Sequence, residues 1–468
     1  MSICGLGSGA TLDFVNKEYA NLDLKDVRLD KRAKHILQVL QKQLGSCIRR
    51  LFTNEKEARQ AYDFFCNVKV TKERLIEPHY EQTVNRIKSS QSRYILAIQD
   101  QIRLNYTHHP AKHDLGRIGK TGKTIQYGII QHSVLCVDDS NTPLGLMDLS
   151  FFDFSEFETE IHRDQRSVTE KTRRYWIDGL NHMRSRLGKD CSTPIITVAD
   201  REGDFYEWLY PLVSNKEAFV IRAQYNRATG EVFKKGNKKL KTILDESPVL
   251  GEMEVTIQDV ASREMRALRL KLKATRITLP VPKHLNKEQT QANQYGAIEL
   301  NAVYAYDGEH EWILLTSLPI ENQEQLQEVI SIYQSRWHIE DYHKVLKTGY
   351  QVDEIYLHSS REAIINLLVL ASISACRLYW LIYVGRSEVE ISADTLFEEF
   401  EWKSVYVYFN EPIPVKAPPI ATTMQYIARL GGYKPSKRAQ PPGIKTFWTG
   451  FQVFTPIAHM YRNMSIKT

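Results

Sequence analysis

Two short apolar runs, each ending in an aspartate, constrain the fold of this chain most strongly. They are Arg93–Asp100 (RYILAIQD) and Pro194–Asp200 (PIITVAD). Runs of this length and composition are typical of buried strands, and a helical pattern follows the second one from Asp204 to Leu212. Thr124–Val137 and Leu144–Phe151 are two further predicted strands. The alternation of strands and helices predicts an α/β fold.

A β-rich block interrupts this pattern between about residues 215 and 320. Within it, Arg266–Leu279 alternates apolar and basic residues. The apolar positions are Leu268, Leu270 and Leu272, and the basic positions are Arg269, Lys271 and Lys273. Successive side chains of a strand point to opposite faces, so we expect one face in the core and a row of positive charge on the other. We interpret the block as an insertion into the α/β domain.

Helical patterns precede and follow this domain. Residues 1–75 contain a basic segment from Arg28 to Arg50, followed by a helix that Asn54 can cap. The basic segment, which includes Arg32, suits phosphate contact, but a solvated helix face has the same composition. Residues 386–468 contain a proline-rich loop and a final pair of predicted helices.

Composition excludes several classes of protein. The chain has 468 residues, of which 42% are hydrophobic and 25% charged, which argues against a disordered chain or a coiled-coil rod. The net charge of +6 permits a polyanionic partner without proving one. Six scattered cysteines with no CxxC pair are typical of reduced thiols.

The most apolar stretch does not predict a membrane span. Its longest uncharged part, Ile364–Cys376, has 13 residues, whereas a spanning helix needs about 20. The N-terminal residues lack the basic flank and apolar core of a secretory signal. We therefore expect a buried helix in a soluble cytoplasmic protein that does not contact a membrane.

A third acid stands on a predicted helix with several cations. Residues Tyr333, Arg336, Glu340, Lys344 and Lys347 recur at helical spacing and share one face. Together with Asp100 and Asp200, Glu340 could bind a divalent metal beside a phosphate. Each aspartate could equally be a turn or helix cap, and the helix face could be a solvated ladder of ion pairs.

The same residues carry a family resemblance. Tyr333, Arg336, Glu340 and Lys347 have the spacing of the Tyr-Arg-Glu-Lys signature of bacterial cut-and-paste DDE transposases of the insertion-sequence-4 family. The chain also resembles this family in five short segments: LAIQD, ITVADREGD, WILLT, IARLGG and WTGF. The resemblance extends over nearly the whole chain.

This resemblance implies an RNase H-like catalytic core with a β-rich insertion, flanked by two helical domains. Residues 1–75 would bind the transposon ends, residues 76–385 would form the catalytic domain, and residues 386–468 would dimerise. The implied partners are double-stranded DNA, as terminal inverted repeats and as target, and a second copy of the chain.

The resemblance also implies the chemistry. Asp100, Asp200 and Glu340 would hold two Mg²⁺ ions, for which Mn²⁺ could substitute. The enzyme would hydrolyse the phosphodiester at each element end, form and reopen a DNA hairpin, and join the freed 3′ hydroxyl to target DNA.

DNA contacts follow from the same motifs. Tyr333, Arg336 and Lys347 would contact phosphates near the cleavage site, Trp312 would stack on a flipped base, and Arg222 would contact DNA. Lys344 shares their helical face, and Arg28 and Arg32 would serve in the end-binding domain.

One departure keeps two alternatives open. Threonines commonly follow the first acid in relatives, whereas Gln101 and Ile102 stand here. The alternatives are a decayed transposase that only binds DNA and a structure-specific nuclease of the same fold.

Overall fold

The computed structural model describes residues 11–42, 51–52, 54–109, 112–157, 172–232, 234, 236–258, 265–286, 295–354, 359–386, 391–436 and 441–465. Its strands are β1 (Ile95–Asn105), β2 (Gly116–Thr121), β3 (Thr124–Asp138), β4 (Pro143–Phe152), β5 (Ile195–Ala199), β6 (Ala218–Arg222), β7 (Gly251–Gln258), β8 (Met265–Leu279), β9 (Ile298–Tyr306) and β10 (Glu311–Thr316). All four runs predicted as strands in the α/β part are strands.

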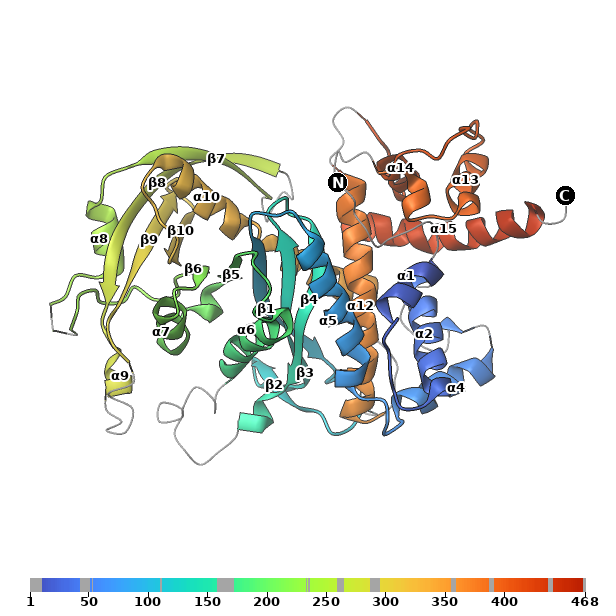
Figure 1. Cartoon of the computed structure of the whole chain (residues 1–468), viewed down its shortest axis with the longest axis horizontal. Coiled ribbons are helices and arrows are strands. Elements are labelled where there is room, and N and C mark those ends of the chain that lie inside the picture. Colours follow the sequence, from blue (N-terminus) through green and yellow to red (C-terminus); the bar gives the residue numbers. More distant parts are fainter. Residues whose placement is uncertain are drawn as a thin grey trace.

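These strands form one ten-stranded sheet in the described part of the chain. Its order is β2-β3-β1-β5-β6-β10-β9-β8-β7, and β4 pairs with β3. β1, β5 and β6 are parallel neighbours, whereas β10 runs antiparallel to β6. The strands of the β-rich block therefore extend the core sheet by continuous pairing, as the left half of Figure 1 shows.

Helices flank the sheet and follow it in sequence. The N-terminal helices are α1 (Thr11–Glu18), α2 (Val27–Lys42), α4 (Glu55–Phe65) and α5 (Lys72–Ser89). The helices of the middle region are α6 (Arg174–Leu187), α7 (Tyr206–Ser214), α8 (Leu240–Glu246), α9 (Lys283–Asn286), α10 (Gln323–Gln334) and α11 (Trp337–Lys344). The C-terminal helices are α12 (Arg361–Arg386), α13 (Glu399–Tyr408), α14 (Ile420–Leu430) and α15 (Ile444–Ser465). Asn54 caps α4, as predicted, by accepting the N–H of Glu57 at 2.9 Å.

Helix α12 is the buried helix that the apolar stretch predicts. It is long and apolar enough to cross a membrane, but 89% of its most apolar window is buried inside the protein. It contacts β4 and α5 on one side and α2, α4 and α14 on others. In Figure 1 it stands between the sheet and the remaining helices on the right. Asn366 of α12 donates to the carbonyls of Phe65 and Val70 at 3.1 and 2.8 Å, which ties α12 to the end of α4.

The hydrophobic core runs without interruption from the N-terminal helices to the C-terminal helices. One cluster of buried residues includes Phe65 of α4, Ile98 of β1, Leu370 of α12 and Phe447 of α15. Since these parts share one core, none of them buries its apolar surface alone.

The alternation in β8 is confirmed with one exception. Leu268, Leu270 and Leu272 are buried, and Arg269 and Lys271 are exposed. Lys273 is only 8% exposed, so the expectation of a solvated charge was wrong there. Its Nζ donates to the carbonyl of Asp245 at 2.7 Å, because the C-terminal end of α8 covers this part of the strand.

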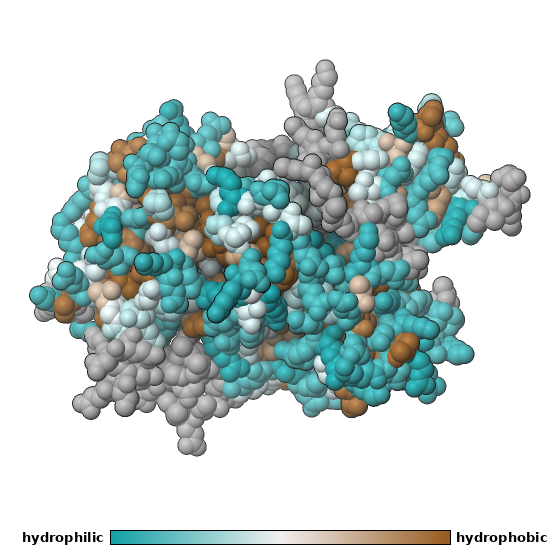
Figure 2. All heavy atoms as spheres, in the orientation of Figure 1, coloured by the Kyte–Doolittle hydropathy of each residue, from teal (hydrophilic) through white to brown (hydrophobic). Residues whose placement is uncertain are grey.

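The surface in the view of Figure 2 is mostly hydrophilic, with hydrophobic residues scattered among the hydrophilic ones. Several of the exposed large apolar side chains belong to the C-terminal helices. Among them are Val407 and Tyr408 at the end of α13 and Met460 and Met464 in α15.

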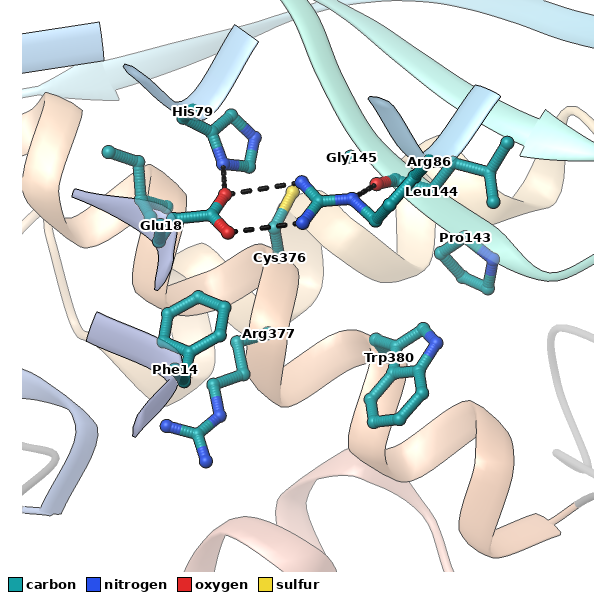
Figure 3. A pocket seen from close by; sticks show the side chains of 11 residues that line it. Phe14, Glu18, His79, Arg86, Pro143, Leu144, Gly145, Cys376, Arg377 and Trp380 are labelled. Atoms are coloured by element: carbon teal, nitrogen blue, oxygen red, sulfur yellow. Dashed lines mark hydrogen bonds and ion pairs between the residues drawn. The ribbon is translucent and has the colours of Figure 1, made fainter. Parts of the chain in front are cut away.

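A buried polar network joins α1 to α5 and β4 (Figure 3). The Glu18 carboxylate accepts two bonds from Arg86 at 3.0 and 3.1 Å and one from Nδ1 of His79. Nε2 of His79 accepts the N–H of Leu146 at 3.0 Å, so Nδ1 must carry the ring proton. Burial opposes the charge of Glu18, but the charge of Arg86 and the hydrogen bonds from His79 and Arg86 prevail and lower its pKa to about 2.

This network predicts an acid-sensitive contribution to stability. A depressed carboxyl pKa stabilises the fold above its unfolded value, and the contribution is lost as pH falls towards 2. Glu18→Gln should therefore lower the free energy of unfolding at pH 7 by about 3 kcal/mol. The deficit should shrink below about pH 4. Urea unfolding at both pH values, with the exposed Glu73→Gln of α5 as control, checks this; equal stabilities at pH 7 would contradict it.

Candidate active site

Strand register brings the first two acids together. β1 pairs in parallel with β5 up to Gln99 and Ala199, and the next residue of each segment is an aspartate. Asp100 and Asp200 therefore lie side by side where the parallel ladder ends. Asp100 was predicted at a strand end, but β1 continues to Asn105 because its antiparallel partner β3 is longer. This difference follows from the pairing of β1 with β3, which the apolar run alone does not predict.

Both aspartates also accept hydrogen bonds from neighbouring backbone N–H groups. Oδ1 of Asp200 accepts the N–H of Glu202 at 2.8 Å and caps the short 3-10 helix η4 (Arg201–Gly203). Oδ1 of Asp100 accepts the N–H of Gln101 at 2.7 Å. Helix capping and a place in the site are thus combined in Asp200. Each carboxylate keeps a second oxygen for other partners.

The predicted signature helix consists of three segments. Tyr333 lies in the last turn of α10, Arg336 lies in a tight turn, Glu340 lies in α11, and Lys347 lies in a π-helical turn, η5 (Val345–Gly349). The N–H of Arg336 bonds to the carbonyl of Tyr333 at 3.0 Å, three residues back, which tightens the chain there. The expectation of one continuous helical face was wrong at this turn.

Arg336 lies between two of the acids. Its guanidinium donates to Glu340, and Nη1 stands 3.6 Å from Oδ2 of Asp100. The Arg336 side chain is 10% exposed. The guanidinium thus links α11 to β1.

The acids are electrostatically crowded. Burial and the neighbouring charge of Asp200 raise the pKa of Asp100 to about 7, with a smaller contribution from Glu340. Arg336 and the Gln101 N–H oppose this rise. A carboxyl with such a pKa is only partly ionised at neutral pH. An added divalent cation would favour its ionised form, so the chemistry of these donors fits Mg²⁺.

The carboxylates do not converge in metal-binding geometry. Within the described residues, no three His, Cys, Asp or Glu side chains are close enough to hold a metal ion. Asp100, Asp200 and Glu340 are included in that statement. The ion pair between Arg336 and Glu340 is a physical reason that the three carboxylates do not converge, because it neutralises the charge of Glu340 locally.

Two aromatic side chains and an arginine border the acids. Trp312 of β10 is half-buried, and its ring meets the ring of Tyr333 edge-to-face with centroids 5.8 Å apart. Tyr333 is 5% exposed, and burial raises its pKa while the charges of Arg336 and Arg222 oppose the rise. Nη2 of Arg222 donates to the carbonyl of Glu311 at 3.1 Å, next to Trp312.

The remaining residues that we predicted to contact DNA lie elsewhere in the chain. Lys344 at the end of α11 is exposed, and Lys347 is 3.7 Å from Asp353. Arg28 is 91% exposed and pairs with Asp26 at 3.2 Å, and Arg32 donates to Gln60 of α4. These two arginines belong to α2, on the other side of α12 from the sheet in Figure 1. The structure therefore groups Tyr333, Arg336, Arg222 and Trp312 with the acids and leaves Arg28 and Arg32 apart. Arg49 and Arg50 of the basic segment lie outside the described residues.

Sequence reasoning missed two contacts of the DREGD segment. The side-chain amide of Gln101 donates to the carboxylate of Glu202. Asp204 is fully buried, pairs with Arg227, and accepts the N–H groups of Gln224 and Tyr225 at 2.7 and 3.3 Å. The acidic residues in the sequence of this segment could have indicated both contacts. The residues that bind these acids, however, lie in other strands and loops.

Asp204 should be a strong determinant of stability. Asp204→Ala leaves Arg227, which is 16% exposed, without its counter-charge and frees two backbone donors. Breaking such a pair costs about 3–5 kcal/mol. Asp204→Asn keeps an acceptor and should cost less. Urea unfolding of both variants, with the exposed Glu231→Ala as control, tests this order; an unchanged Asp204→Ala midpoint would contradict it.

Comparison with known proteins identifies all three regions. Residues 12–70 match the transposase DNA-binding family, residues 165–375 the transposase DDE domain, and residues 373–465 the Tn5 transposase dimerisation domain. The cryo-EM structure of the piggyBac transposase synaptic complex with hairpin DNA aligns with 98% of this chain and 72% of its own, at 9% identity and a TM-score of 0.33. The three matches follow one another along the chain in the order binding, catalysis and dimerisation. The chain therefore belongs to the DDE transposases and resembles the Tn5 transposase.

Proposed function

We propose that this transposase works by a cut-and-paste mechanism that depends on a divalent metal. It would hydrolyse the phosphodiester at each transposon end, form and reopen a hairpin, and transfer the strand into target DNA. Membership of the insertion-sequence-4 family, suggested by the signature residues, is part of this proposal. The chain binds DNA and dimerises, as its matched domains indicate.

One observation carries the proposal. The Asp100 side chain, 16% exposed, lies beside Asp200 and within the electrostatic reach of Glu340, and partial burial and these charges raise its pKa to about 7. Such crowding of acids costs free energy unless a cation relieves it, and it is typical of functional sites. We therefore propose Asp100, Asp200 and Glu340 as the ligands of two Mg²⁺ ions, with Mn²⁺ as a substitute.

When bound, Mg²⁺ would neutralise charge on the scissile phosphodiester and favour attack by water or by the freed 3′ hydroxyl. The protein side chains would supply positioning. Arg336 holds Glu340 and Asp100, and a DNA phosphate is an equally good bidentate partner for its guanidinium. Arrival of DNA would thus draw Arg336 towards phosphate and release Glu340 for the metal.

The other candidates would hold the DNA. Tyr333, Lys344 and Lys347 share the helical segments next to Glu340 and would contact phosphates near the cut. Arg222 lies at the end of β6 beside Trp312 and would contact the same strand. Arg28 and Arg32, on α2, would bind more distant parts of the transposon end.

We further propose the context of the reaction. A homodimer would bridge two transposon ends and act on DNA in the bacterial cytoplasm, at the nucleoid. A decayed transposase would bind the ends without cutting them, and a structure-specific nuclease would cut without joining strands. Incubation with end DNA, target DNA and Mg²⁺ separates the three.

Asp200→Asn should abolish DNA cleavage while DNA binding and folding persist. A neutral amide is a poor ligand for Mg²⁺, and the amide oxygen can still accept the Glu202 N–H that caps η4. The measurement is cleavage of labelled end DNA in Mg²⁺ beside a gel-shift assay.

The matched control is Asp190→Asn, an exposed aspartate in the loop before β5. It should cleave DNA at the wild-type rate. Wild-type cleavage by Asp200→Asn would remove Asp200 from the proposed metal site.

Trp312→Ala should impair hairpin formation more than first-strand nicking. Extruding a base costs a few kcal/mol, and stacking on an aromatic ring returns about 1–3 kcal/mol. Trp312 is half-buried, so part of its ring is available for stacking. Resolving nicked, hairpin and double-cut products on a gel measures the effect.

Trp312→Phe keeps an aromatic face and should retain most hairpin formation. Thermal melting of both variants guards against a packing defect against Tyr333. Equal loss at all steps, together with a large drop in melting temperature, would assign Trp312 to the core and not to DNA.

A further inference from the structure

The connection between β1 and β5 continues past the end of their backbone ladder. The ladder stops at Gln99 and Ala199, one residue before the two aspartates. Beyond that point the side-chain amide of Gln101 donates to the carboxylate of Glu202. A side-chain bond thus takes over where the backbone pairing ends.

This bond completes a chain of contacts from one aspartate to the other. Oδ1 of Asp100 accepts the Gln101 N–H at 2.7 Å, and Oδ1 of Asp200 accepts the Glu202 N–H at 2.8 Å. The residue that orients each aspartate through its backbone also holds the opposite residue through its side chain. Any change in the Gln101–Glu202 bond therefore reaches both carboxylates.

Gln101 can do this without entering the metal site. Successive side chains of a strand point to opposite faces, so the Gln101 side chain leaves β1 on the face opposite Asp100. Gln101 therefore does not occupy the face of β1 that carries the Asp100 carboxylate. A shorter side chain such as threonine has no terminal amide to extend towards Glu202.

We infer that Gln101 and Glu202 are positioning residues that fix the spacing of Asp100 and Asp200 and thereby set the affinity of this site for Mg²⁺. The inference rests on the proposed metal-dependent function. It also gives the departure from the family pattern at residue 101 a structural partner.

The choice of Mg²⁺ follows from geometry. Mg²⁺ demands near-ideal octahedral coordination, whereas Ca²⁺ accepts flexible arrangements of oxygen ligands. A looser pair of aspartates should therefore lose more affinity for Mg²⁺ than for Ca²⁺. Losing a group that orients metal ligands typically costs about 10–100-fold in affinity.

The test measures metal binding without catalysis. Melting temperature of the full chain is titrated with Mg²⁺ and separately with Ca²⁺ in the absence of DNA, where Asp100 and Asp200 would hold the ion with water as its other ligands. Gln101→Met removes the amide donor at similar length, and Gln101→Glu places a second carboxylate opposite Glu202. Both should raise the Mg²⁺ concentration for half-maximal stabilisation about tenfold or more, and the Ca²⁺ value less.

The rescue variant exchanges the two groups. Gln101→Glu combined with Glu202→Gln places a carboxylate on β1 and an amide on η4, so the same bond forms in reverse with unchanged net charge. Its Mg²⁺ response should return close to the wild-type value. Gln91→Met, at an exposed glutamine before β1, is the matched control and should respond like the wild type. The metal-free melting temperatures of Gln101→Met, the double variant and Gln91→Met should agree with that of the wild type, because a general packing role would lower them.

Asp200→Asn separates failure of the inference from failure of the metal site. If Asp200→Asn loses the Mg²⁺ response but Gln101→Met keeps the wild-type value, the positioning role is wrong and the metal site stands. If the double variant responded to Mg²⁺ as weakly as Gln101→Glu does, that result would also overturn the positioning role. If wild type and Asp200→Asn respond alike, the proposed metal site is wrong and the positioning role falls with it.

Discussion

Burial of helix α12 is the constraint on which the arrangement of this protein depends. Its side chains are apolar around most of the helix, so every face needs a partner. Strand β4, helices α5, α2 and α4, and the C-terminal helix α14 supply those partners. Each fully buried leucine or isoleucine contributes about 1.5–3 kcal/mol, so the three regions are held together by one shared core. The DNA-binding and dimerisation regions are thereby fixed relative to the catalytic sheet.

Within that frame, the mixed sheet determines where the chemistry can occur. β1 is parallel to β5 and antiparallel to β3, and β3 extends further than β5. One side of β1 therefore loses its partner at Asp100 while the other side remains paired to Asn105. This leaves Asp100 on a rigid strand with one open edge. Asp200 follows β5 at the same level, so a carboxylate pair forms without any loop having to fold over.

The balance of positive and negative charges then determines the electrostatic state of the site. Asp100, Asp200 and Glu340 concentrate negative charge, and Arg336 compensates only part of it. Burial, together with the remaining negative charge of Asp200 and Glu340, raises the pKa of Asp100. In the proposed function, a divalent cation would relieve this imbalance and DNA phosphate would compete for the arginine. The site would then trade some stability for binding capacity.

The sequence by itself determined the strands, the buried helix, the order of the three regions and the family signature, because these depend on local period and spacing. Tertiary structure alone decided the continuation of β1 past Asp100, the turn at Arg336, the burial of Lys273 beneath α8 and the bond between Gln101 and Glu202. Gln101 and Glu202 are distant in sequence and meet only because β1 and β5 pair in one particular register. Periodicity reports which face of a strand is apolar, but not which strand lies next to it or where their pairing stops. For that physical reason the acids could be named from the sequence, whereas the contacts that position them could not.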